Sequence, residues 1–278
     1  MTSRLLFICF LATLFTLPTN AAEKREEIVE YTLDFAPGKK LSVHARNGGI
    51  TLKTWTSDQI FVRAEKKAKA SDEEGAEELL ETTTIEIEET DSGIEIRTQR
   101  PDNKWNLFKD WNISVNYTIT VPQNVHLDLE TVNGSISIPP TTGNVKSETV
   151  NGSIKINGTR GAIDVETVNG KINLTEIIGG IKAETVNGSI EIAIAEQIQD
   201  NIRAEAVNGG LQISLPSDFQ GRIQAESTIG HIDTEFPIVV KGRVGGRINK
   251  SLKGNLNGGN GPNIKLQTLN GGIDIKQL

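Results

Sequence analysis

Cysteine and aromatic residues are scarce in this chain. The single cysteine, Cys9, lies inside an apolar N-terminal segment, so a chain without that segment has no cysteine. Removal of the segment would therefore exclude disulfides, cysteine-ligated zinc sites and thiol catalysis. Aromatic residues make up 5% and hydrophobic residues 36%, whereas glycine is frequent at 27 residues. This composition favours a core of small aliphatic rungs closed by glycine turns over a globular α/β enzyme.

Positive charge and histidine are also in short supply. The chain has 29 Lys and Arg against 36 Asp and Glu, a net charge of −7. Binding to nucleic acid needs clustered basic residues, so we expect no nucleic-acid partner. His44, His126 and His231 fall in separate segments, and no Gly-x-Ser-x-Gly or phosphate-loop motif is present. We therefore expect no catalytic, cofactor-binding or metal-binding residues.

Long hydrophobic runs are limited to one, Leu5 to Leu17. Arg4 precedes it, Pro18 ends it, and Ala21-Ala22 supplies small residues for cleavage. These features predict a signal peptide over residues 1–22, because the run is short for a membrane span. The alternative is an uncleaved N-terminal anchor. We expect an exported protein (periplasmic, on the outer surface or secreted) with no transmembrane segment after cleavage.

A repeat dominates the second half of the chain. The segment Glu130 to Ile136 (ETVNGSI) recurs three times in steps of 18 residues, with one Ser replaced by Lys171. Two looser copies follow in steps of 21. One late copy and one shorter, early copy complete the set. The copies other than the one at 130–136 span residues 148–154, 166–172, 184–190, 205–211, 226–232, 267–273 and 46–50.

Glycines spaced nine residues apart divide each repeat into two short segments of alternating apolar and polar residues. Such alternation is typical of strands with one buried face. In a coil with two strands per turn, each residue lies about 4.8 Å from the residue 18 positions later. Identical neighbours then follow from stacking, and Ile136, Ile154, Ile172 and Ile190 would form one interior column. The prediction is an all-β, single-stranded β-solenoid with about 18–21 residues per rung.

Two polar columns follow from this register. One is a structural ladder of asparagines, since Asn tolerates left-handed backbone and its amide can bond to adjacent rungs: Asn133, Asn151, Asn169, Asn187 and Asn208. The other is a column of glutamates, which as stacked like charges repel one another. Basic residues two positions before three of them can offset this repulsion. The glutamate column is interpreted either as a solvated face or as an array for cations or a basic partner.

The remaining segments are less regular. Residues 23–123 are expected to form an N-terminal β-rich part that caps the solenoid of residues 124–278. It would contain seven short strands and a helix at Ser71–Glu81, with Ser71 as N-cap and Glu74 closing a capping box. The Gly-rich residues 242–263 are predicted to be a mobile loop inserted between the last rungs. An aromatic cluster is a candidate binding site for a sugar or lipid surface: Trp105, Phe108 and Trp111.

The nine-residue spacing is shared with calcium-binding β-rolls, but their Asp ligands are missing. We therefore predict no metal-dependent folding and no cofactor.

At the level of family, the chain resembles the bacterial adhesin-like proteins with β-strand repeats, of the domain-of-unknown-function 4097 type. The resemblance rests on the signal peptide, Asn47 to Ile50, the strand Tyr117 to Pro122 and the repeated Thr-Val-Asn-Gly-Ser-Ile. It covers roughly residues 28–278 and implies no catalytic residues. The Gly-rich segment 242–263 departs from the family's pattern.

Three functions remain open at this point. The first is a non-enzymatic exported structural or adhesin-like protein that presents a repetitive surface to an envelope or surface ligand, either glycan or protein. The second is a self-assembling scaffold or filament protein. The third is a β-helix carbohydrate-active enzyme, which would need a unique polar cluster outside the regular columns.

Overall fold

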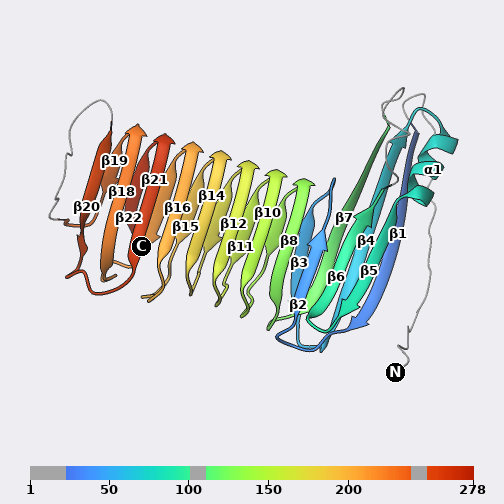
Figure 1. Cartoon of the computed structure of the whole chain (residues 1–278), viewed down its shortest axis with the longest axis horizontal. Coiled ribbons are helices and arrows are strands. Elements are labelled where there is room, and N and C mark those ends of the chain that lie inside the picture. The colour runs from blue at the N-terminus through green and yellow to red at the C-terminus, as the bar shows by residue number, and fades with distance from the viewer. Residues whose placement is uncertain (1–22, 101–110, 239–248) are drawn as a thin grey trace.

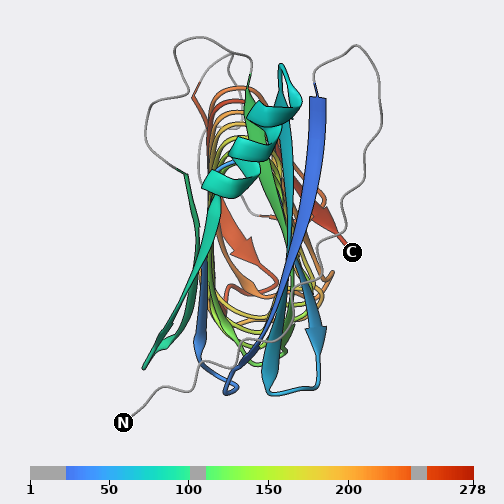
Figure 2. The ribbon, with the colours of Figure 1, turned by 90° about the vertical axis from the view of Figure 1, so that its right-hand side faces the viewer.

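Two long β-sheets face each other along the whole molecule (Figures 1 and 2). The computed structural model describes residues 23–100, 111–238 and 249–278. The first sheet has the strand order β1-β4-β7-β3-β9-β11-β13-β15-β17-β22-β19. The second has the order β20-β18-β21-β16-β14-β12-β10-β8-β2-β6-β5. The predicted all-β solenoid is confirmed.

The central rungs each contain one strand of the second sheet followed by one of the first. Strands of neighbouring rungs run parallel, with partners 18 residues apart for the first four rungs, so that Ile154 pairs with Ile136 and Ile172. The ten strands of this region are β8 His126–Asn133, β9 Ile136–Ile138, β10 Val145–Asn151, β11 Ile154–Asn157, β12 Ile163–Asn169, β13 Ile172–Thr175, β14 Ile181–Asn187, β15 Ile190–Ala193, β16 Ile202–Asn208 and β17 Leu211–Leu215.

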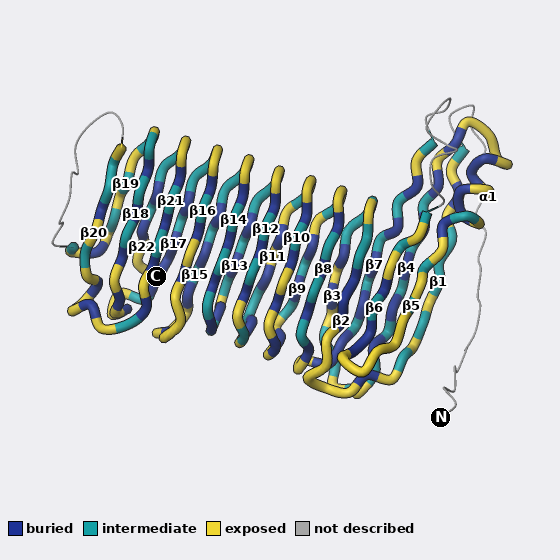
Figure 3. Tube along the Cα trace, viewed as in Figure 1, coloured by how far each residue is buried: buried dark blue, intermediate teal, exposed yellow. Residues whose placement is uncertain are grey.

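The core lies between the two sheets. Buried residues recur along the strands of every rung (Figure 3). Because side chains alternate along each strand, every second residue points inward, and most of these inward residues are aliphatic, with Ser or Thr at some positions of the second sheet. Ile136, Ile154 and Ile172 line one wall, and Val145 and Ile163 line the other, all with 2% or less of their surface exposed. A rung alone cannot bury this face, so its stability depends on the rungs on either side.

One glycine in each rung, such as Gly134, Gly152 and Gly170, lies at the turn and forms a glycine column along the stack. This column allows neighbouring rungs to approach closely. A Cβ on Gly152 would lie 1.9 Å from the carbonyl oxygen of Gly134, and one on Gly170 would lie 1.8 Å from that of Gly152. Real Cβ atoms never come so near another atom, so the position requires glycine because of close backbone contact. The requirement repeats at each rung and fixes the spacing of the turns.

The N-terminal part extends both sheets and adds antiparallel strands. Its elements are β1 Glu23–Asp34, β2 Lys40–His44, β3 Ile50–Trp55, β4 Gln59–Ala70, α1 Glu73–Thr82, β5 Thr84–Thr90, β6 Gly93–Gln99 and β7 Asn112–Pro122. Strand β4 pairs antiparallel with both β1 and β7, and β5 pairs antiparallel with β6. Among the described residues no helix is long and apolar enough to cross a bilayer.

The helix begins later than the sequence predicts. Its N-cap is Asp72, not Ser71, because the Asp72 carboxylate accepts a hydrogen bond of 2.8 Å from the backbone N–H of Gly75. A carboxylate at this position also interacts favourably with the helix dipole. Leu79 and Leu80 then pack against a small cluster that includes Ile113.

At the C-terminal end, spatial order departs from chain order. The elements are β18 Gly221–Ile229, β19 Ile232–Thr234, β20 Lys250–Leu256, β21 Asn263–Asn270 and β22 Ile273–Gln277. The rung β21/β22 lies between β16/β17 and β18/β19. Glu226 therefore does not stack on Glu205, as the 21-residue step suggests, since Gln267 lies between them.

The N-terminal end has a similar insertion, because β2/β3 lies between β6/β7 and β8/β9.

The prediction of a loop over residues 242–263 is partly wrong. Residues 242–248 lie outside the described part, but β20 is an edge strand antiparallel to β18. The frequent Gly and Asn residues of this segment indicate a loop, although Leu252 and Leu256 are buried. The edge of β18 that does not pair with β21 provides the backbone hydrogen-bonding partners of β20.

Candidate functional site

A groove of about 690 Å³ follows the outer face of the second sheet, crossing its rungs. Three side-chain columns line it, and each rung contributes a Glu, a Thr and a Val or a close substitute. In chain order the principal lining residues are Glu130, Thr131, Val132, Glu148, Thr149, Val150, Glu166, Thr167, Val168, Glu184, Thr185, Val186, Glu205, Val207, Gln267, Thr268 and Leu269. The groove is therefore a periodic surface.

The valine column is the unexpected part of this groove. In Glu-Thr-Val-Asn the strand alternation directs Thr inward and leaves Glu and Val outside. Val132, Val150 and Val168 each expose 39% of their surface, and Val186 exposes 40%. A contiguous exposed apolar patch is typical of an interaction site. The sequence contained a signal for it, since Val recurs two residues after every Glu of the regular repeats.

The glutamates of the groove are paired with basic side chains, which relieves the stacking of like charges. Glu148 contacts Lys146 at 2.7 Å, and Glu205 contacts Arg203 at 2.9 Å. Lys182 bridges three carboxylates, of which Glu166 is the nearest at 2.6 Å. The expected offset by basic residues two positions earlier is present in all three rungs.

This network shifts the ionisation of its members. The hydrogen bond from Lys182 to Glu166, together with nearby Asp164, raises the pKa of Lys182 above its ordinary 10.5. At the far rung, hydrogen bonds from Gln224 and Gln267 lower the pKa of Glu226 below 4.5. Both shifts favour the charged forms of Lys182 and Glu226, and the glutamates of the column are half-exposed at the groove wall.

Beside the groove, the asparagines form a continuous hydrogen-bonded ladder. The Nδ2 atom of Asn151 donates to Oδ1 of Asn133 at 2.8 Å, and the pattern continues from rung to rung through Asn169, Asn187 and Asn208. The ladder extends to Asn47 at one end and Asn270 at the other. Left-handed backbone is not its cause, because the non-glycine residues with positive φ in the described part are Glu176, Asn249 and Asn257.

The threonines beneath the groove have a structural role. Thr149 Oγ1 donates to the carbonyl oxygen of Gly134 at 3.0 Å, and Thr167 does the same to Gly152. Each buried hydroxyl thus bonds to the turn of an adjacent rung, which satisfies a polar group that would otherwise be costly to bury.

Of the aromatic candidates, Trp105 and Phe108 lie outside the described residues. Trp111 is described, and it packs against the helix cluster of Ala76, Leu79 and Leu80. Its indole N–H donates to Ser71 Oγ at 3.3 Å. This placement gives Trp111 a role in closing the α1 region.

The contacts of the histidine side chains follow from the fold and not from their spacing in the sequence. His44 lies between two carboxylates, with Nδ1 3.0 Å from Glu130 and Nε2 3.0 Å from Glu95. A neutral ring has one N–H, so only the imidazolium donates to both. His126 instead accepts a hydrogen bond at Nδ1 from the backbone N–H of Asn144. Neither contact was evident from sequence spacing.

Several solved structures match this chain at low similarity. A "putative adhesin" from Bacteroides fragilis is 13% identical, with a TM-score of 0.43, and the match covers 91% of this chain and 97% of that one. A "putative cell adhesion protein" from Clostridium sporogenes is 16% identical, with a TM-score of 0.36 and coverage of 92% and 100%. No curated protein matches the sequence. At these values the family assignment rests on the sequence match.

That match is to the family model described as Toastrack DUF4097, and it spans residues 141–276. The matched segment contains β10 to β22, and so includes most of the groove and the inserted rung. It confirms the resemblance to the DUF4097 adhesin-like family that the repeats indicated. Residues 141–276 of this chain are thus a β-solenoid of the Toastrack DUF4097 family.

Proposed function

We propose that this chain is an exported, non-enzymatic, adhesin-like protein that binds an elongated partner along the groove of the second sheet. The observation that carries the proposal is the continuous exposed column of Val132, Val150, Val168, Val186 and Val207 beside the glutamates. A soluble surface rarely repeats an exposed apolar residue in register over five rungs unless that surface contacts something.

The chemistry of the groove favours a basic and partly apolar polypeptide. Its glutamates attract cationic groups, and its valines offer apolar contact at each rung, about 4.8 Å apart. Sugar-binding surfaces commonly rely on aromatic rings, and none of the described residues that line this groove is aromatic. A protein ligand of the cell envelope or surface is therefore favoured over a glycan.

The regularity of the columns favours binding over catalysis. A reaction needs one constellation of acid, base or nucleophile held in a unique geometry. Each rung of the groove instead presents the same side chains in the same register, as Glu148 pairs with Glu130 and with Glu166. Such a surface suits a partner that is contacted at several equivalent points.

Self-assembly into a filament is less well supported than partner binding. Open strand edges promote such assembly, whereas short or charged edge strands oppose it. Edge strand β19 has three residues, and β20 carries Lys250 and Lys253. At the other end β1 and β5 are rich in charged residues.

Export is tested by cell fractionation combined with protease treatment of intact cells. We expect residues 1–22 to be removed, leaving a mature chain with the proposed parts 23–123 and 124–278. Mass spectrometry of the recovered protein would give the cleavage point. Recovery of the full-length chain from the cytosol would contradict the proposal.

Groove binding is tested with the double variant Val150→Glu plus Val168→Glu. Purified mature protein is sedimented with isolated cell envelopes, and the bound fraction is measured over a concentration series. We expect the apparent affinity to fall at least tenfold, because two apolar contacts are lost to charge. The matched control is Ser137→Glu plus Asn173→Glu on the outer face of the first sheet, which adds the same charge. Equal binding by the groove variant and the control would contradict the groove as the contact surface.

A further inference from the structure

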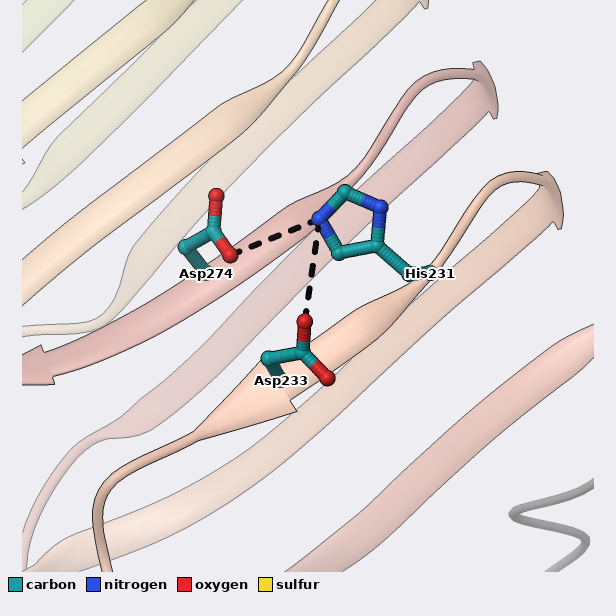
Figure 4. A group of neighbouring side chains, drawn as sticks. All are labelled: His231, Asp233 and Asp274. Carbon is teal, nitrogen blue, oxygen red and sulfur yellow. Dashed lines mark ion pairs between the residues drawn. The ribbon is translucent and has the colours of Figure 1, made fainter.

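The last rungs bring together three side chains that the sequence keeps apart (Figure 4). His231 lies just before β19, Asp233 lies on β19, and Asp274 lies on the neighbouring strand β22. His231 Nε2 is 3.5 Å from Asp274 Oδ1 and 3.8 Å from Asp233 Oδ2. One ligand-type atom from each residue lies within 4.8 Å of the other two.

The inserted rung creates this cluster. Parallel pairing of β19 with β22 places Asp233 directly opposite Asp274. The His231 ring lies over the backbone of Gly272, where a Cβ would be only 2.2 Å from the ring atom Cε1. The corresponding position in the earlier regular rungs is Ser153, Lys171 or Ser189, so the glycine gives the ring space to reach Asp274.

The two aspartates face each other as like charges, which is unfavourable for directly opposed residues of a sheet. Among the described residues, the ion-pair partner of both is His231. This differs from the glutamate column of the groove, where Lys146, Lys182 and Arg203 neutralise the stack. A cation between the aspartates would remove the repulsion.

The spacing of the cluster suits a shared metal ion better than hydrogen bonds. The two His–Asp distances, 3.5 and 3.8 Å, exceed the 2.7–2.9 Å usual for charge-assisted hydrogen bonds. Ligands held tetrahedrally at about 2.1 Å from zinc are roughly 3.4 Å apart. The three ligand atoms all lie within 4.8 Å of one another, and Asp233 is exposed, so its carboxylate has room to turn toward the other two.

We propose that His231, Asp233 and Asp274 form a surface site for a divalent transition-metal ion of the Zn²⁺ class. Imidazole nitrogen with two carboxylate oxygens is a ligand set that zinc accepts, and a water molecule or a group from a partner completes the coordination. Calcium fits less well, because it takes six to eight oxygen ligands. The site lies on the first sheet and is independent of the groove proposed for partner binding.

The test is isothermal titration of ZnCl₂ into the purified mature chain, residues 23–278, without an affinity tag. We expect His231→Ala to reduce the Zn²⁺ stoichiometry by one equivalent. Asp274→Asn should keep the site but weaken its affinity at least tenfold, and Asp233→Asn should act similarly. Each variant is checked by circular dichroism, and all three positions are exposed enough for the fold to persist.

His126→Ala and His44→Ala are the matched controls, since they remove an imidazole elsewhere on the molecule. Both are expected to retain the Zn²⁺ equivalent that His231→Ala loses. Two results would overturn the proposal: no Zn²⁺ binding by the parent chain, or binding that is unchanged in His231→Ala. The first would show that the cluster takes no Zn²⁺, and the second would place the bound Zn²⁺ at another site.

Discussion

The central rungs and the two ends of this molecule are built from the same motif but by different chain paths. From β10 to β15 each rung packs on the rungs directly before and after it in the chain. At the C-terminal end β21/β22 enters between two rungs formed earlier, and at the N-terminal end β2/β3 lies between rungs formed later. The motif therefore specifies how a rung packs, whereas the connecting segments decide which rung it packs on.

The central rungs and the inserted rung also differ in the loop-closure entropy that their contacts cost. Central rungs form contacts between residues close in the chain, which cost little loop-closure entropy. The inserted rung pairs Ile273 with Leu211, far away in the chain. Such non-local pairing is slow to form, and it ties the end of the molecule to its interior.

The largest expected effect comes from deleting the inserted rung. Removal of residues 263–278 exposes neighbours of Ile264, Leu266, Ile273 and Ile275, all 1% exposed or less. Four such aliphatic side chains contribute roughly 6–12 kcal/mol by their burial, comparable to the stability of a domain. We expect loss of the cooperative unfolding transition, measured by circular dichroism during urea titration.

Deletion of a central rung is the matched control. Removal of residues 170–187 leaves Asn169 followed by Gly188, so the repeat continues without interruption and Ile163 can pair with Ile202. We expect this variant to unfold cooperatively with a modest decrease in midpoint. If both deletions abolished the cooperative unfolding transition, the inserted rung would be no more important for stability than a central rung.

The second effect concerns the glycine column. In Gly152→Ala the new Cβ would lie 1.9 Å from the Gly134 carbonyl, so two rungs must separate locally. We expect the free energy of unfolding to fall by about 2–4 kcal/mol, in the range of severe core mutations. Gly271→Ala, in the inserted rung, should cost a similar amount, since its Cβ would lie 2.0 Å from the Gly209 carbonyl.

Gly180→Ala provides the comparison within the same region. The nearest atom to its Cβ is 3.4 Å away, an ordinary contact. We expect a change within about 0.5 kcal/mol, as for most surface substitutions. A large loss at Gly180 would show that backbone flexibility, and not close approach, explains the glycines at the regularly spaced turns.

The third effect tests the asparagine ladder. Asn169 donates to Asn151 at 2.8 Å and accepts from Asn187 at 2.9 Å, so Asn169→Ala removes two hydrogen bonds. We expect a loss of about 1–2 kcal/mol in urea unfolding. The last rung carries Ile229, 55% exposed, at the position beside Asn270. Ile229→Asn should extend the ladder without loss of stability, and a clear destabilisation there would argue against it.

The smallest effect comes from Lys182→Gln. Lys182 is 40% exposed, so the loss should stay below about 1 kcal/mol and shrink further at 1 M salt. Because its pKa is raised in the folded chain, its contribution is complete below 10.5 and lost as the pH rises through the folded value. Urea unfolding at low and high salt measures it.

Lys253→Gln at the end rung is the control for that measurement. Its amine is 3.8 Å from Glu226, longer than a hydrogen bond, so no measurable change is expected. A loss at Lys253 equal to that at Lys182 would mean that general charge balance, not the bridging geometry, supports the column.

Much of the fold follows from the repeat alone. The 18-residue period predicts that Ile154 lies between Ile136 and Ile172, and the structure confirms it. The period could not predict that Gln267 would separate Glu205 from Glu226, because similar rungs carry the same residues at their edges and the repeat does not encode which rung packs on which. Register was predictable, but adjacency at the ends was not.

The candidate surfaces divide in the same way. The glutamate column and its basic partners were evident from spacing, whereas the exposed valines were not considered, since Val in a strand is usually buried. His231 and Asp274 share no sequence motif, and only the insertion of β22 beside β19 makes them neighbours. Sites that depend on connectivity are therefore invisible to a local pattern.

The placement of β21/β22 also bears on the timing of biosynthesis. A ribosome delivers residues 263–278 after both of the rungs that flank them, β16/β17 and β18/β19. Until residues 263–278 have emerged, strands β16 and β18 lack the parallel partner that lies between them in the structure. This end of the stack is therefore completed only after residues 263–278 have been made, so the order of synthesis differs from the order of the rungs in space.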